Sequence, residues 1–160
     1  MVLVRMIVAA AVAITLSAGA GAEQPRCTPW ELVNPWPQAN HLRDVAFGGG
    51  RWVAVGEGVA VVSTDAAAWA AVTLPGLSLN GVAYGNGAFV AVGDGGAVRA
   101  AIARSPDGMA WTHGAFPAIP ARLLAVAGGR RVQLAVGAAG LTLRRECHPQ
   151  SPSRRLRGTR

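Results

Sequence analysis

Residues 45–56 read VAFGGGRWVAVG, residues 82–93 read VAYGNGAFVAVG, and residues 126–137 read VAGGRRVQLAVG. Each stretch contains a short apolar run, a turn with glycine, and a second apolar run that ends in Ala-Val-Gly. Two apolar runs joined by a glycine turn are typical of a β-hairpin. The copies are spaced by 37 and 44 residues. The sequence therefore predicts an all-β fold built from about three antiparallel repeats.

A second motif, S-x-D-x-x-x-W, follows the hairpin in the first two repeats. Its two copies contain Ser63, Asp65 and Trp69, and then Ser105, Asp107, Gly108 and Trp111. The motif resembles the Asp-box, or BNR, repeat of sialidase-like and photosystem II assembly factor-like β-propellers, over roughly residues 42–143. The resemblance implies a structural role away from any active site. The aspartate accepts hydrogen bonds from backbone N–H groups of a turn, and the tryptophan packs on a neighbouring strand.

The boxes depart from this pattern in two places. Ala66 stands where the first box would have glycine, so we expect that turn to be distorted. The third repeat has no box, because residues 146–149 (ECHP) interrupt it. With these departures, residues 23–147 are predicted to form a partial β-propeller of about three antiparallel blades.

The number of blades leaves the closure of the fold open. Residues 27–37 contain Trp30 followed by prolines, as the box tryptophans are, so they are a candidate last strand that completes the third blade. Propellers typically have four to eight blades. Three arrangements stay open: a truncated propeller with a free edge, two chains that form a six-bladed ring, and a compact sheet arrangement that is not a propeller. A free edge invites association, which favours a homo-oligomer or a partner.

Both ends of the chain carry segments outside the repeats. Residues 1–22 contain Arg5, an apolar run over 6–16 and small residues before Glu23, which is the three-part pattern of a cleaved signal peptide. We predict a signal helix that is removed on export to the periplasm or the cell exterior, and no stable membrane span after cleavage. Residues 148–160 are rich in Pro, Ser and Arg and are predicted to be disordered.

The chain has two cysteines, Cys27 and Cys147, near the two ends of the repeat region. In an oxidising compartment two such residues can pair, which predicts a disulfide within one chain or between two chains. The alternative is two unrelated thiols.

The net charge of +7 does not lie on the repeats. Six arginines fall within residues 144–160, whereas residues 23–143 hold eight arginines and seven acidic residues. Because the repeats are nearly neutral and show no basic face, the sequence argues against a nucleic-acid partner.

The sialidase resemblance raises a catalytic hypothesis that the residues do not favour. It implies an arginine cluster, a tyrosine nucleophile with a glutamate, and an acidic proton donor. The single tyrosine, Tyr84, stands where the first repeat has Phe47, so we interpret it as a packing residue. Glu57 and Asp94 hold equivalent glycine-rich positions and are interpreted as turn residues. No metal-ligand spacing or cofactor motif is found, so no metal and no cofactor are expected.

These observations favour an exported, non-catalytic binding or scaffold module whose ligand is an unidentified protein or glycan. The alternative is a truncated or degenerate glycosidase of the sialidase-like class. Three residues hold equivalent hairpin turns and are candidates to face a ligand: Arg51, Asn86 and Arg130.

Overall fold

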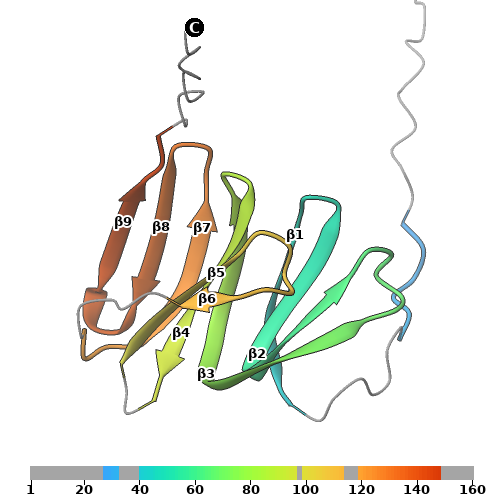
Figure 1. Cartoon of the computed structure of the whole chain (residues 1–160), viewed down its shortest axis with the longest axis horizontal. Coiled ribbons are helices and arrows are strands. Elements are labelled where there is room, and N and C mark those ends of the chain that lie inside the picture. The colour runs from blue at the N-terminus through green and yellow to red at the C-terminus, as the bar shows by residue number, and fades with distance from the viewer. Residues whose placement is uncertain (1–26, 33–39, 97–98, 114–118, 149–160) are drawn as a thin grey trace, which may run out of the picture. The chain divides into compact units, whose positions relative to one another are not determined.

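The computed structural model describes residues 27–32, 40–96, 99–113 and 119–148. The regular elements in this part of the chain are β1 (Leu42–Gly48), β2 (Arg51–Ser63), β3 (Ala70–Gly85), β4 (Ala88–Gly95), β5 (Ala100–Ser105), β6 (Thr112–His113), β7 (Leu123–Gly128), β8 (Val132–Gly137), the 3-10 turn η1 (Ala138–Gly140) and β9 (Thr142–Glu146). All strand pairs are antiparallel. The strands run in chain order through one sheet, β1 to β6, and a second, β7 to β9 (Figure 1). The all-β, antiparallel prediction is confirmed.

Two strands change direction midway. The first half of β2 pairs with β1, and its second half pairs with the first half of β3. The second half of β3 then pairs with β4. The changes fall at Gly58 and Gly76, whose φ angles of 67° and 75° suit glycine, and Figure 1 shows both strands turning sharply. The first sheet therefore holds two successive meanders: repeat 1 (residues 42–74) and repeat 2 (residues 77–113).

Core packing confirms that β2 turns back on itself. On a straight strand, every second side chain points to the same face. Val53 and Val55 instead share a buried cluster with Ala60 and Val62, so the alternation switches at Gly58. Each meander thus follows the pattern of a hairpin, a turn and a further strand. Repeat 3 (residues 123–146) contains β7, β8 and β9.

The core lies between neighbouring repeats. Val53 and Val55 of repeat 1 pack in one cluster with Leu79 and Phe89 of repeat 2, which are fully buried. A smaller cluster joins repeats 2 and 3 and contains Val92, Leu123 and Ala135. Burying a side chain such as Phe or Leu stabilises a fold by about 1.5–3 kcal/mol. Two of the three buried clusters therefore join neighbouring repeats, and the third, with Ala54, Val59 and Val61, lies within repeat 1.

Close backbone approach also joins the repeats. A Cβ on Gly48 would overlap the ring of Tyr84, and a Cβ on Gly85 would lie 3.1 Å from the Cα of Gly128. A hydrogen bond of 2.8 Å runs from the Val82 N–H to Oδ2 of Asp44. The first strand of each repeat thus lies beside the first strand of the next.

The predicted terminal segments fall mainly outside the described residues. The chain divides into two units, Met1–Glu31 and Leu32–Arg160. The signal peptide over 1–22 and the tail beyond His148 lie outside the described residues. Of the candidate closing strand, residues 27–32 form no strand, and residues 33–37 are not described, so this closure stays a prediction.

Candidate functional site

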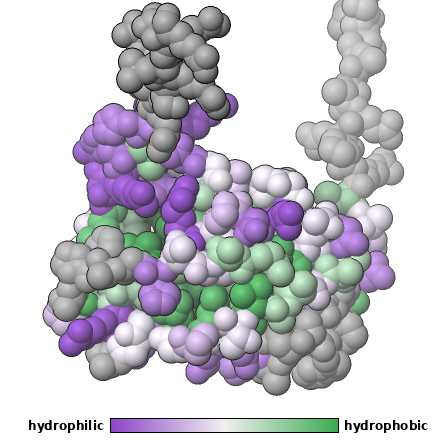
Figure 2. Space-filling model, viewed as in Figure 1, coloured by the Kyte–Doolittle hydropathy of each residue, from purple (hydrophilic) through white to green (hydrophobic). Residues whose placement is uncertain are grey.

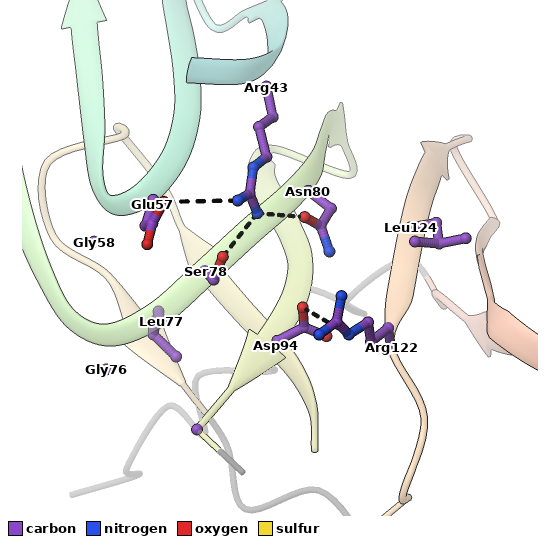
Figure 3. A pocket seen from close by; sticks show the side chains of 11 residues that line it. Arg43, Glu57, Gly58, Gly76, Leu77, Ser78, Asn80, Asp94, Arg122 and Leu124 are labelled. Carbon is purple, nitrogen blue, oxygen red and sulfur yellow. Dashed lines mark hydrogen bonds and ion pairs between the residues drawn. The ribbon is translucent and has the colours of Figure 1, made fainter. Parts of the chain in front are cut away.

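A polar pocket of about 590 Å³ lies at the ends of the strands where β2 and β3 bend and β7 begins. All three repeats contribute to its wall (Figure 3). Its side chains come from Arg43, Glu57, Leu77, Ser78, Asn80, Asp94, Arg122 and Leu124. The volume lies within the range of small-molecule sites, but the lining is more polar than is usual for them.

Arg43 forms the wall of the pocket on the side of repeat 1. Its Nη1 donates to Oγ of Ser78 and Oδ1 of Asn80, both at 2.7 Å. Its Nη2 lies 3.8 Å from Oε2 of Glu57. Asn80 in turn donates from Nδ2 to the carbonyl oxygen of Leu123 at 2.8 Å. This chain of contacts links the three repeats, so Arg43 supports the wall and its donors are largely occupied.

Asp94 and Arg122 form the other side of the pocket. Nε of Arg122 lies 3.8 Å from Oδ2 of Asp94, which is too long for a strong hydrogen bond. The Asp94 side chain is 17% exposed, and its Oδ1 is buried and has no hydrogen-bond partner. The Arg122 side chain is 59% exposed. A buried acceptor without a donor is costly, and the partly exposed Asp94 carboxylate also places a negative charge in the pocket wall beside the cation of Arg122.

The sequence analysis did not find this pocket. Glu57 and Asp94 were interpreted as turn residues, and both do lie where a strand ends or bends, but both also line the pocket. Their equivalent positions in successive repeats indicated only that the two side chains would lie at the same ends of the strands. Arg43 and Arg122 gave no such signal, because they precede the repeated stretches.

The first Asp-box forms a compact turn after β2. Oδ1 of Asp65 accepts hydrogen bonds from the N–H groups of Ala67 and Ala68, both at 2.9 Å, and from Oγ of Ser63. Nε1 of Trp69 donates to the carbonyl oxygen of Ala66 at 3.3 Å. Ala66 takes the left-handed conformation itself, with φ of 60°, so the turn forms without a glycine, although its tryptophan bond is longer than the bond of 2.6 Å in the second box.

The second Asp-box forms the same turn after β5. Oδ1 of Asp107 accepts from the N–H groups of Met109 and Ala110 at 2.9 and 3.0 Å. Nε1 of Trp111 donates to the carbonyl oxygen of Gly108 at 2.6 Å. Oγ of Ser105, which is fully buried, accepts from the Gly108 N–H at 2.8 Å.

These hydrogen bonds lower the pKa of both box aspartates. For Asp65 the N–H of Ala68 contributes most, followed by that of Ala67, and for Asp107 the N–H of Ala110 contributes most. Hydrogen bonds to a carboxylate favour its charged form. Each carboxylate is therefore committed to its own turn, and this suits a structural role better than proton transfer.

The predicted ligand-facing turns lie at the other ends of the strands from the polar pocket. Arg51 begins β2 and lines a shallow hollow beside the first box. Asn86 is exposed at the β3–β4 turn, with φ of 53°. Arg130 is exposed at the β7–β8 turn, the end of repeat 3 where hydrophilic surface gathers in Figure 2. The structure therefore does not bring these three residues into the pocket.

The remaining candidate residues take no part in the pocket. Tyr84 packs edge-on against Phe89, with ring centroids 4.8 Å apart, so it is a packing residue as expected. Cys27 is exposed and Cys147 is half-buried, and both are free thiols, so the disulfide is not seen and stays a prediction. Among the described residues, no group of three side chains is placed to hold a metal ion. In the same residues no helix is long and apolar enough to cross a membrane.

Comparison with known proteins gives little further guidance. No protein-family model and no curated protein sequence matches the chain. Among solved structures, the computationally designed Ika4 protein is similar, with a TM-score of 0.38 and 9% sequence identity, over 76% of this chain and 100% of that one. A score this low does not establish a shared fold, so the strands and the pocket must carry the interpretation.

Proposed function

We propose that the chain is an exported, non-catalytic binding module whose three repeats are blades of a partial, Asp-box type β-propeller. The regular order of strands in each repeat supports the blades, and the two box turns support the type. The binding role rests on one observation: the carboxylate of Asp94 and the exposed guanidinium of Arg122 lie side by side in the wall of a polar pocket.

A glycan is the ligand that fits this chemistry best. One sugar hydroxyl would donate to the partly exposed carboxylate of Asp94, and a neighbouring hydroxyl or carboxylate would accept from the exposed guanidinium of Arg122. Leu77 and Leu124 provide apolar surface for the C–H face of a sugar ring. The alternative ligand class, a protein, would need a larger contact than this pocket supplies.

The test is a glycan panel measured by calorimetry with the wild type and three variants. Asp94→Ala and Arg122→Ala should each weaken binding of any hit about tenfold or more, since each removes a charged hydrogen bond of about 1.5–3 kcal/mol. Arg51→Ala is the matched control, because Arg51 lies outside the pocket, and it should leave binding unchanged. Loss of binding in Arg51→Ala alone would place the ligand at the hairpin turns instead.

A glycosidase remnant is the second candidate, and one observation favours it: Glu57 and Asp94 line the same pocket. Glycoside hydrolysis commonly uses two carboxyl groups on either side of the scissile bond. Release of a fluorogenic sialoside or other glycoside by the purified protein, abolished in Asp94→Asn and in Glu57→Gln, would establish it. Absence of turnover across the panel, together with glycan binding, would leave the binding module.

Export and the disulfide are part of the same proposal. Cleavage after residue 22 predicts a mature chain that starts at Glu23, which intact mass of secreted protein would reveal. Non-reducing electrophoresis of that protein should show a bond between Cys27 and Cys147 if the thiols become oxidised. Two free thiols in the secreted protein would remove the bond from the account.

A further inference from the structure

The exposed large apolar side chains of repeats 1 and 3 gather on two sheet faces. The first face, on repeat 1, consists of Leu42, Val45, Phe47 and Trp52. The last face, on repeat 3, consists of Leu124, Leu134 and Val136. Within residues 40–148, as far as they are described, Met109 is the one exposed large apolar side chain outside these faces.

The first face corresponds to a covered face of repeat 2. With the offset of 37 residues, its four positions match Leu79, Val82, Tyr84 and Phe89. These four side chains pack in the cluster that joins repeat 2 to repeat 1. The first face is therefore the surface with which a repeat contacts the repeat before it, and in the described chain no repeat precedes repeat 1.

The last face corresponds to the surface with which a repeat contacts the repeat after it. Leu134 and Val136 hold the positions of Val53 and Val55, which are fully buried against repeat 2. Their own exposed fractions are 43% and 45%. The last face is therefore the surface that a following repeat would cover, and none follows among the described residues.

The contact between a hairpin glycine and an aromatic ring of the next repeat shows how the two faces fit. Gly48 leaves room for the ring of Tyr84 from the next repeat. The equivalent glycine of repeat 3 is Gly129, and the nearest described atom to a Cβ there is the carbonyl oxygen of Val132, in its own hairpin. Phe47, the equivalent of Tyr84, is 56% exposed. Phe47 thus has no glycine of a neighbouring repeat beside it, and Gly129 has no aromatic ring of a neighbouring repeat beside it, among the described residues. The two lie at opposite ends of the three repeats.

We propose that a second copy of this chain covers both faces, with the first face of each copy packed on the last face of the other. The contact would repeat the one that already joins repeat 1 to repeat 2, with Phe47 of one copy beside Gly129 of the other. Two such contacts close a ring of six repeats, which lies within the usual range for propellers. A closed arrangement also leaves no free face to drive filament growth.

The first test is the solution mass of the purified protein by light scattering over a range of concentrations. A mass of two chains supports the proposal. A mass of one chain at every concentration overturns it. Larger open assemblies would also overturn it, since they would show head-to-tail contacts that do not close.

Charged variants then decide which faces meet. Phe47→Asp disables the first face and Leu134→Asp the last face, so each alone should be monomeric. An equimolar mixture should form dimers again, because it restores one intact first face and one intact last face. Met109→Asp is the matched control, with an exposed apolar residue outside both faces, and should stay dimeric.

Other outcomes of the variant experiment contradict the proposal. If Leu134→Asp stays dimeric while Phe47→Asp does not, two first faces meet each other and the last face is not involved. If the mixture stays monomeric although both single variants are folded by circular dichroism, the faces do not complement each other. Should either variant fail to fold, Val45→Asp and Val136→Asp repeat the test on the same two faces.

Discussion

Repeat 2 and repeat 1 place the same kind of residues in different environments. Phe89 in repeat 2 is fully buried, whereas Trp52, at the equivalent position in repeat 1, is 37% exposed. Each belongs to an aromatic pair across its hairpin, with ring centroids 4.8 Å apart for Phe89 and Tyr84 and 4.7 Å for Trp52 and Phe47. The local structure is therefore the same in both repeats. The difference lies in the neighbour, which is present for repeat 2 and absent for repeat 1 among the described residues.

Repeat 3 sharpens this comparison, because it lacks the aromatic pair. Gly128 and Gln133 stand at the positions of Tyr84 and Phe89. Gln133 is buried, and its Nε2 lies 3.5 Å from the carbonyl oxygen of Gly85, at the limit for a hydrogen bond. The contact between repeats 2 and 3 thus has less apolar surface than the contact between repeats 1 and 2, and we expect it to open first.

The largest expected effect comes from truncating the buried ring of repeat 2. Phe89→Ala should lower the free energy of unfolding by about 3–5 kcal/mol, because it leaves a cavity between two repeats. Trp52→Ala, the equivalent change in repeat 1, should cost less in dilute protein, because Trp52 is already 37% exposed there. Urea unfolding measures both. Equal losses would contradict the difference in burial.

The next effect tests the contact between Gly48 and the ring of Tyr84. Gly48→Ala should destabilise the protein by about 1–3 kcal/mol, because the added Cβ would overlap the ring of Tyr84. In a Tyr84→Ala background the same change should cost much less, and a double-mutant cycle of the unfolding free energies measures that coupling. Absence of coupling would show that the two first strands do not approach as described.

Substitutions in the two Asp-boxes should change the free energy of unfolding by smaller amounts, with opposite signs in the two boxes. Gly108→Ala should destabilise by about 1–2 kcal/mol, because φ is 79° and the new Cβ would lie 2.5 Å from Cγ2 of Val53. Ala66→Gly should instead stabilise by up to about 1 kcal/mol, because it relieves a left-handed alanine. Thermal unfolding distinguishes the two, and a loss of stability in Ala66→Gly would contradict the strain assigned to the first box.

The smallest expected effect is a dependence on pH. Asp65 and Asp107 have pKa values below the ordinary one, so their stabilising bonds are fully present above about pH 4, the unfolded value. That stability is lost as the pH falls below 4 through the folded pKa. The melting temperature of wild type should therefore fall more between pH 4 and 2 than that of Asp65→Asn or Asp107→Asn. Equal slopes would show that the boxes do not hold their turns.

Sequence periodicity was sufficient to predict the strands, because each hairpin and box repeats in the chain. It could not predict the outcome at Ala66, since alanine can accept the left-handed conformation when the surrounding hydrogen bonds favour it. The polar pocket was also beyond prediction, because Arg43, Asp94 and Leu124 come from three repeats and line one pocket only when the repeats are packed. The turns chosen as ligand-facing, such as Arg51, were conspicuous in the repeat but lie at the other ends of the strands.

The central claim is that repeats 1 and 3 each leave one apolar face open and that a second copy covers both. Oxidative footprinting read by mass spectrometry tests it most directly, at a concentration where the protein is dilute and at one where it is associated. Phe47, Trp52 and Leu134 should label in dilute protein and become protected together on association, while Met109 labels at both concentrations and Phe89 at neither. Labelling of Phe47 and Leu134 that does not change with concentration would contradict the account.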